Sequence, residues 1–425
     1  MRKTGPAVLT LSLGVFGIIT TEMGVVGVLP RISEDLGVTP SAAGWLVGVF
    51  ALVVAATGPF GTLLASGLRR KAVLASALAV FALSNAVYAL TDDFAVMFAF
   101  RILPALFHPV FFAVALTTAA DLVPEHRATR AATTVFAGVT VGFAFGVPLT
   151  SYLAEHAGLA AAFWFGAGVN LLACLGVLLL LPPTPATPAT PAAPAAPAGR
   201  RPSYRGQLAI LRRGRLWLSV LAVVCVFAAM FSVYGYFAEY LERVTGLSAS
   251  LVGAALMAFG IVMVLGNLLF GRLLERDLPR TVTAFPALYV LLYALLYAIG
   301  PWPAPMTAGV LLWGAVHSGG LVVSQSWLAR DAQDAPEFGN SLFISFSNLG
   351  ITAGSAVGGL VVSTAGARHL PWAGAGFALA ALAAVLLRRR LGPATQATPT
   401  PQTPAQDEPT TDDAAAPDSA RAATA

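Results

Sequence analysis

The sequence predicts an all-α integral membrane protein whose twelve transmembrane helices form two six-helix bundles. Three observations predict this fold class: a low content of charge, the length of the apolar runs, and a repeat that relates the two halves of the chain. The 425 residues are 57% hydrophobic and 11% charged, whereas a soluble domain carries about 25% charged residues. Because so little charge cannot cover a surface in water, we expect most of the surface to face lipid.

The apolar runs have the length, roughly 18 to 26 residues, at which a helix crosses the hydrocarbon core of a bilayer. They fall into two sets of six. The first set lies near 7–29, 42–65, 72–90, 94–120, 131–154 and 159–181, and the second near 216–241, 250–274, 281–300, 304–328, 338–363 and 371–387.

These runs divide the chain into four parts. Residues 1–181 are predicted to form the N-terminal bundle, and residues 216–391 the C-terminal bundle. Residues 182–215 are rich in Pro, Ala and Thr and then in Arg, a composition typical of a solvated linker. Residues 392–425 are polar and contain several Pro and Asp, so we expect a disordered tail.

The positions of the basic residues predict the orientation in the membrane. If the N-terminus is cytoplasmic, only three of the 25 lysines and arginines lie in the outer loops, namely Arg31, Arg243 and Arg368. Basic residues flanking spans favour the cytoplasmic side. Both termini, the linker and the tail are therefore predicted to be cytoplasmic.

Composition also excludes several classes of function. The net charge of +5 is spread over short loops between apolar runs, so there is no basic domain for nucleic acid. Cys174 and Cys225 each lie inside an apolar run, which offers neither a disulfide framework nor a metal site. We expect no metal and no cofactor, and a monomer whose partners are lipid, protons and a small-molecule substrate.

The two halves carry matching segments. Gly61–Arg70 and Gly271–Arg280 share five residues at a constant offset of 210, and both join the second and third spans of their half. Gly142 and Gly146, in the fifth span, match Gly354 and Gly358 at an offset of 212. Two matches at equivalent places predict duplicated parallel halves, an arrangement that places a substrate site at the interface between them.

Three further segments carry a family resemblance. They are TTEMGVVGVLP (Thr20 to Pro30), RILPALFHPVFF (Arg101 to Phe112) and GVTVGFAFGVP (Gly138 to Pro148). Together they resemble the first, fourth and fifth helices of the major facilitator superfamily, and most closely its twelve-span drug:proton antiporters. These are bacterial exporters of drugs, chloramphenicol, sugars or nucleosides. The family usually has glycines where Ala105 and Pro109 stand.

The resemblance implies a bacterial inner-membrane protein that exports small molecules in exchange for protons by alternating access. The few formal charges in the spans favour a neutral, largely apolar or amphiphilic substrate. The alternative is a proton-coupled transporter of a sugar or nucleoside, working as an importer. An enzyme is not expected, because one clear carboxylate lies in a span and the five histidines are scattered.

The loop motif of the family, Gly-x-Leu-Ala-Asp-Arg-x-Gly-Arg-Arg, is present in two altered copies. In the first copy, which ends at Arg70, Ala65 and Ser66 replace the aspartate and the first arginine. The second copy keeps an acid–base pair as Glu275 and Arg276. The resemblance implies a charge contact that gates one face, and we expect it in the second copy.

Glu22 and Arg101 are the clear ionisable residues inside spans, where a charge is costly and usually functional. Each lies roughly 12 Å below the outer surface at 1.5 Å per residue, so they are predicted to pair. Glu22 would then carry protons; the alternative is a permanent ion pair that joins the first and fourth spans. His108 lies seven residues after Arg101 on the same helix face, where it relays protons or simply bonds a backbone carbonyl.

Other polar and small residues are assigned to the cavity and the hinge. Gly142 and Gly146 with Pro148 are either close-packing positions or a pliable hinge that favours export. The stripe of Ser341, Ser345, Asn348 and Thr352 either lines the cavity or bonds a neighbouring helix. Phe112 is placed in the cavity wall. Tyr236 and Glu239, with Tyr234 and Tyr240, either close the cavity from outside or belong to an aromatic belt facing lipid.

Overall fold

The computed structural model describes residues 4–64, 68–182, 210–333 and 336–391. Every regular element within these ranges is helical. Most of the predicted linker and the whole predicted tail lie outside the described residues. The elements below belong to one unit that extends to Leu391.

The N-terminal bundle consists of six spans, of which the fifth is built from three pieces. Helix α1 contacts α5, α6 and α7, and α4 contacts α2, α3 and α5. The elements are α1 (Thr4–Asp35), α2 (Pro40–Leu64), α3 (Arg70–Leu90), α4 (Phe94–Asp121), α5 (Glu125–Val141), the π-helix η1 (Gly142–Gly146), α6 (Val147–Ala157) and α7 (Leu159–Leu180).

The C-terminal bundle follows the same plan with two differences. Its elements are η2 (Ile210–Arg212), α9 (Gly214–Tyr234), α10 (Phe237–Arg243), α11 (Ala249–Ile299), α12 (Pro303–Asp331), α13 (Pro336–Ala365), η3 (Ala367–His369) and α14 (Leu370–Arg390). The predicted seventh span is interrupted after Tyr234, so that α10 forms a separate short helix. The predicted eighth and ninth spans are continuous as α11, whose backbone leaves the helical region at Asp277 (φ −157°, ψ 88°).

Eleven helices in the described ranges are long and apolar enough to cross a membrane. Helix α11 has 51 residues, which at 1.5 Å per residue is about 77 Å, more than twice the roughly 30 Å of a bilayer core. It therefore supplies two spans, and the predicted twelve spans fit these helices.

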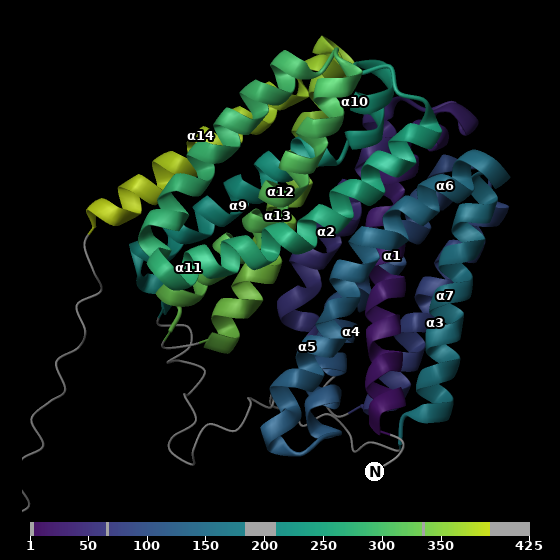
Figure 1. Cartoon of the computed structure of the whole chain (residues 1–425). Helices are drawn as coiled ribbons and strands as arrows, with labels where there is room; N and C mark the ends of the chain where they lie inside the picture. The colour runs from purple at the N-terminus through teal and green to yellow at the C-terminus, as the bar shows by residue number, and fades with distance from the viewer. Residues whose placement is uncertain (1–3, 65–67, 183–209, 334–335, 392–425) are drawn as a thin grey trace, which may run out of the picture. The chain divides into compact units, whose positions relative to one another are not determined.

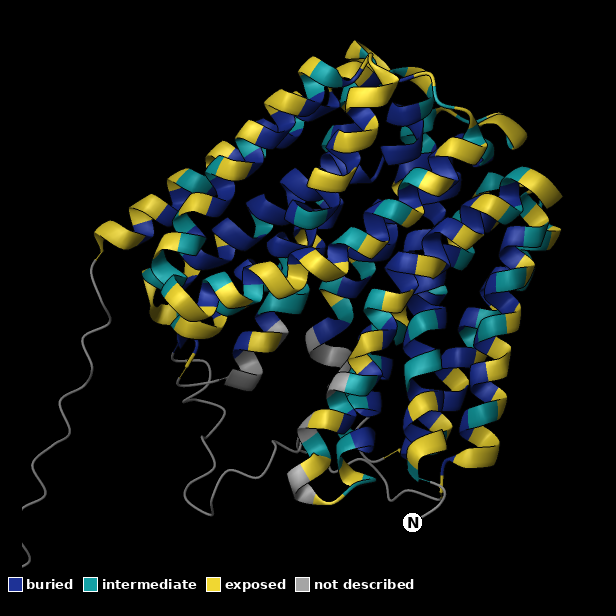
Figure 2. Cartoon of the chain, viewed as in Figure 1, coloured by how far each residue is buried: buried dark blue, intermediate teal, exposed yellow. Residues whose placement is uncertain are grey.

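The surface of these helices is inverted relative to that of a soluble protein. Large apolar side chains are exposed along α7, including Leu171, Leu172 and Leu179, whereas Asn170 of the same helix is fully buried. Figure 2 shows the same pattern of exposed outer faces and buried inner faces on many helices. Exposed leucines are stable when lipid covers them, and a buried amide needs hydrogen-bond partners that lipid cannot supply.

The two bundles lie side by side and contact each other at three places (Figure 1). Helix α2 packs along α13, α11 packs on η1 and α6, and α1 contacts α10. A Cβ on Gly44 of α2 would come within 1.9 Å of the Tyr236 hydroxyl, and one on Gly260 of α11 within 2.5 Å of Ala144 Cα in η1. Glycine is therefore required at both crossings.

The π-helix η1 is caused by Pro148. Proline has no N–H, so the carbonyl four residues before it, that of Ala144, loses its usual helical donor. The chain widens here, and the Val147 N–H bonds the carbonyl of Gly142. A Cβ on Gly142 would lie 2.7 Å from Ile19, and one on Gly146 would lie 2.1 Å from the Thr20 hydroxyl. The glycines thus face α1 of their own bundle.

Candidate functional site

Glu22 lies at the centre of the N-terminal bundle, with its carboxylate beside His108. The distance from Glu22 Oε2 to His108 Nε2 is 3.1 Å, and the two side chains are 7% and 12% exposed. Helix α1 positions the carboxylate and α4 the imidazole. This pairing differs from the prediction, in which the carboxylate of Glu22 paired with Arg101.

Arg101 is 1% exposed and bonds backbone carbonyls instead of a carboxylate. Its Nε donates to the carbonyl of Leu46 at 2.9 Å, its Nη1 to that of Thr21 at 2.7 Å, and its Nη2 to that of Glu22. Helix carbonyls can accept these bonds because each oxygen has a second lone pair. The guanidinium also lies over the Phe50 ring, 4.7 Å from its centroid. Arg101 therefore joins α4 to α1 and α2.

A buried amide network fixes α1 one residue before Glu22. Thr21 Oγ1 accepts from Asn85 Nδ2 of α3 at 2.8 Å and from Asn170 Nδ2 of α7 at 3.1 Å, and donates to the carbonyl of Gly17 at 2.9 Å. No sequence pattern links the two asparagines, which lie 85 residues apart in the chain. Their only signal was an amide within an apolar run, which does not reveal a shared partner.

Aromatic rings surround the imidazole of His108. The Phe112 ring centroid lies 4.7 Å from it, and the Phe50 ring meets it edge-on at 5.7 Å. Phe112, which was assigned to the cavity wall, therefore lies beside the Glu22–His108 pair. The pair has an apolar surround in which a change of charge is costly.

A second cluster of rings surrounds His317 in the C-terminal bundle. His317 is 1% exposed, and the rings of Tyr234 and Phe259 lie 4.7 Å and 5.3 Å from it. Its Nδ1 is 3.4 Å from the Tyr289 hydroxyl. Phe143 of η1 approaches Tyr234 across the bundle contact, with ring centroids 6.3 Å apart. The aromatic cluster around His317 therefore contacts η1 of the N-terminal bundle through Tyr234.

Tyr236 and Glu239 lie at the end of the unit marked by α10. The Tyr236 hydroxyl donates to the carbonyl of Ser355 in α13 at 2.9 Å, and Glu239 Oε1 lies 2.7 Å from Arg243 Nε. Tyr234, Tyr236 and Tyr240 are each 1% exposed, which contradicts the lipid-facing belt. Glu239 is part of α10, and among the described residues it makes no hydrogen bond or ion pair with a residue of the Glu22 site.

The polar stripe of α13 faces α2. Thr352 Oγ1 lies 3.2 Å from the carbonyl of Gly48 in α2 and 3.0 Å from that of Asn348. Asn348 Nδ2 donates to the carbonyl of Ile344 at 2.9 Å. Within the described part of the chain, Ser345 Oγ and Asn348 Oδ1 are buried without hydrogen-bond partners. The side chain of Ser341 lies outside the described residues.

The predicted gating contact of Glu275 and Arg276 is not formed with any described residue in this conformation and stays a prediction. Both side chains are exposed, and neither makes an ion pair with a described residue. Instead, Asp277 caps the helix after the kink: its Oδ1 accepts from the Arg280 backbone N–H at 2.9 Å, and its carboxylate lies 3.2 Å from Arg280 Nε.

Other ion pairs occur at the end of the unit where α1 begins. Arg70 pairs with Asp121 at the end of α4. Asp331, which follows Asp121 by the same 210 residues that relate the loop segments, pairs with Arg388 and accepts from the Ser219 hydroxyl. Each pair joins helices of one bundle.

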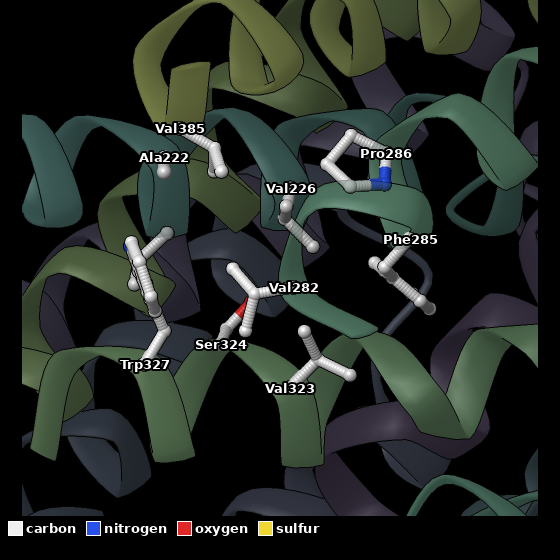
Figure 3. A pocket seen from close by; sticks show the side chains of 10 residues that line it. Ala222, Val226, Val282, Phe285, Pro286, Val323, Ser324, Trp327 and Val385 are labelled. Atoms are coloured by element: carbon white, nitrogen blue, oxygen red, sulfur yellow. The ribbon is translucent and has the colours of Figure 1, made fainter. Parts of the chain in front are cut away.

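A small apolar pocket lies inside the C-terminal bundle, among α9, α11, α12 and α14. Figure 3 shows Trp327 and Phe285 at opposite sides of it, with Val226, Val282 and Val323 between them. No titratable side chain lines it, so it has no role in proton chemistry. Among the described residues, no group of three or more His, Cys, Asp or Glu could hold a metal ion.

Comparisons with known proteins agree with this architecture. The profile described as Major Facilitator Superfamily matches residues 11–337 and 239–417. The inner membrane transport protein YdhP of Escherichia coli strain K12 is 31% identical over 92% of this chain and 98% of its own. A chloramphenicol resistance protein of Streptomyces lividans is 32% identical over 82% of this chain and 86% of its own.

A solved structure has the same fold. A bacterial homologue of the human lysosomal transporter Spinster, in an inward-facing and unoccupied conformation, superposes with a TM-score of 0.71 over 91% of this chain and 95% of its own, at 16% identity. The predicted all-α membrane fold and the predicted family are both confirmed.

Proposed function

Because this chain belongs to the major facilitator superfamily, it is a membrane transporter and not an enzyme, and we propose that it exports small, largely apolar or amphiphilic molecules in exchange for protons. The observation that carries the proposal is the buried contact between Glu22 and His108, 3.1 Å apart. A carboxylate and an imidazole are the two side chains best suited to exchange a proton near neutral pH.

The surroundings of the pair support a role in proton transfer. An isolated charge in an apolar environment is strongly disfavoured. When the pair holds one proton, Glu22 and His108 are either an ion pair or two neutral groups, so no net charge is buried. Gaining or losing a further proton changes the net charge of the site, which gives the protein a reason to change conformation or to bind substrate.

Arg101 is a positioning residue in this proposal. Its recorded hydrogen bonds are to carbonyls of α1 and α2, so it holds the Glu22 backbone in place without a direct bond to the carboxylate. The alternative of a permanent Glu22–Arg101 ion pair loses its geometric support. The amides of Asn85 and Asn170 hold the same turn of α1 from the other side.

Alternating access is supported by where the bundles meet. Tyr236, at the break between α9 and α10, fills the space left by Gly44 of α2 and bonds the carbonyl of Ser355 in α13. We assign this end to the outside, in a bacterial inner membrane with both termini cytoplasmic, because the basic loops lie at the opposite end. The conformation described here is then closed to the outside.

The substrate class follows from the rings near the pair. Phe50 and Phe112 flank His108, and a second pair of rings, Phe143 and Tyr234, meets where the two bundles contact each other. Such a surface suits a neutral aromatic molecule, and a relative carries the name chloramphenicol resistance protein. Chloramphenicol is therefore the first compound to test, followed by other antibiotics, sugars and nucleosides.

The test is transport into liposomes with an acidic interior, with the membrane potential held at zero by potassium and valinomycin. An antiporter accumulates substrate on the acidic side whichever way it is inserted. For one proton per neutral substrate, one pH unit drives about tenfold accumulation. Accumulation only when the exterior is acidic would identify a symporter and support the alternative of a proton-coupled importer. Transport that does not respond to the pH gradient would refute proton coupling.

A further inference from the structure

The two bundles also meet at a charged contact, which we call the α10 seam. Helix α10 contacts α1 there (Figure 1), and the end of α6 joins the seam through the ion pair of Glu155 with Arg31 of α1. Helices α1 and α6 belong to the N-terminal bundle, and α10 to the C-terminal bundle. Any movement that separates the bundles at this end must therefore separate the side chains of the seam.

Four carboxylates converge on the seam, and only two of them have a cation partner. Glu155 of α6 lies 3.3 Å from Arg31 of α1, and Glu239 lies 2.7 Å from Arg243 within α10. Neither Glu34 of α1 nor Glu242 of α10 makes an ion pair with a described residue. The seam thus holds more negative than positive charge when the bundles are in contact.

Burial makes this excess of charge more costly. The Glu239 side chain is 2% exposed, and its Oε1 accepts no well-aligned hydrogen bond from a described residue. Burial raises the pKa of Glu239, and the weaker opposing effect of Arg243 lowers it only in part. Burial without full hydrogen bonding disfavours the ionised form of a carboxylate. Glu239 lies one helical turn from Glu242.

The other elements packed on α10 do not neutralise Glu242. The short helix η3 contributes Arg368 and His369, but the Arg368 guanidinium lies over the Tyr297 ring at 5.3 Å, and His369 Nδ1 contacts the carbonyl of Ala365 at 2.7 Å. Helix α11 carries no charged residue between 249 and 271 or between 281 and 299. The remaining charges near Glu242 are those of α1, α6 and α10.

We propose that Glu242 is a proton-binding site that stabilises the closed α10 seam. A proton on Glu242 removes one negative charge from the crowded contact, and the bundles then meet without that repulsion. Separation of the bundles moves Glu34 and Glu155 away from Glu242 and returns it to water. Proton binding to Glu242 and closure of the bundles at this end are therefore linked. The linkage requires only that the bundles separate at the α10 seam, and it does not depend on the role of Glu22.

The direction of the linkage follows from the pKa in the two states. Burial, and then repulsion from Glu239, Glu34 and Glu155, raise the pKa of Glu242 from an ordinary 4.5 to about 7, against the lowering effect of Arg31. A pKa raised in the closed state means that the proton's stabilisation of closure is complete below about 4.5 and is lost as the pH rises through 7. Between pH 8 and pH 6, the ratio of closed to open protein should rise about tenfold.

The experiment measures separation of the two bundles at this end with a single cysteine. Cys174 and Cys225 are buried and are replaced by alanine, and Ser41 is replaced by cysteine. Ser41 lies at the contact of α2 with α13, where a Cβ on Gly359 would lie 2.8 Å from its hydroxyl. Labelling by a hydrophilic maleimide is followed in nanodiscs, and each rate is divided by that of a cysteine at exposed Ala160 to remove the pH dependence of thiol reactivity.

In the wild-type background, we expect the normalised labelling rate to fall about tenfold from pH 8 to pH 6. Glu242→Gln should give a low rate that does not change with pH, because the amide imitates the protonated acid. Asp92→Asn, which removes an exposed carboxylate that is not among the charges acting on Glu242, should behave as the wild type. Rates independent of pH in the wild type, or a full pH response in Glu242→Gln, would overturn the proposal.

A second variant keeps the test decisive if Glu242→Gln does not fold. Glu34→Gln alters an exposed side chain and removes one source of repulsion, so it should move the midpoint of the labelling curve to lower pH. An unmoved midpoint counts against Glu242. The assay uses no substrate and no proton gradient, so its failure is separable from failure of the proposed transport function.

Discussion

Replacing Glu22 with glutamine should abolish proton-driven accumulation while leaving the protein folded. Glutamine has the shape of the protonated acid and cannot release a proton. The recorded bonds of Arg101 are to carbonyls and so remain, and the Thr21 network does not involve the carboxylate. We therefore expect a change in the free energy of unfolding of at most about 1–2 kcal/mol. Breaking a permanent buried ion pair would cost about 3–5 kcal/mol.

The size of the transport effect follows from thermodynamics. With one proton exchanged per neutral substrate, a gradient of one pH unit supports about tenfold accumulation. In Glu22→Gln the accumulation ratio should fall to one. Downhill exchange of labelled for unlabelled substrate should persist and lose its pH dependence. Glu22→Asp should keep partial accumulation, because it still titrates but is too short to keep the same contact with His108.

The assay is uptake into acid-interior liposomes, with protein content and thermal unfolding measured on the same preparations. Asp92→Asn is the matched control: it makes the same chemical change at an exposed site and should accumulate substrate as the wild type does. Tenfold accumulation by well-folded Glu22→Gln would refute the assignment of Glu22 as proton carrier. A parallel loss of exchange, accumulation and thermal stability would instead show that the carboxylate is structural.

Three further predictions concern the framework of the site. Arg101→Lys should lower the free energy of unfolding by about 2–4 kcal/mol in thermal melts, because one ammonium cannot reach carbonyls on two helices; exposed Arg31→Lys should change it by less than about 1 kcal/mol. Gly146→Val should reduce the yield of folded protein, since a Cβ there would lie 2.1 Å from a threonine hydroxyl, whereas Gly168→Ala, with open space around it, should not. A tag after Ala425 should be protected from impermeant reagents in intact cells, and labelling from outside would contradict the proposed orientation.

The location of the spans could be predicted because lipid imposes its requirement on each span separately. A run such as Leu159–Leu180 must be long and apolar whatever its neighbours are, so its sequence is sufficient. The break in α11 at Asp277 was located by the same reasoning, as a charged loop between two runs. The separate helix α10 was not, because Gly235 and Tyr236 remain apolar enough to continue a span.

The candidate site was predicted in its members but not in its contacts. Glu22, Arg101 and His108 stood out because each is ionisable or polar within an apolar run. Depth along the helices placed Glu22 level with Arg101, but depth does not give the rotation of a helix about its axis. In the structure α1 turns its carbonyls toward Arg101 and the carboxylate toward His108. The rotation of α1 about its axis decides whether the Glu22 carboxylate meets Arg101 or His108. No sequence pattern gives that rotation.

The sequence by itself thus determined the class of protein and its spans, and it singled out the few ionisable residues inside those spans, since each of these depends on composition and spacing along one helix. Only the tertiary structure decided which of those residues meet. Thr21 joins Asn85 and Asn170 from two other helices, and Glu34, Glu155 and Glu242 gather at one seam from both bundles. The physical reason is that hydrogen bonds and charge repulsion act over a few ångströms in space, whatever the separation along the chain.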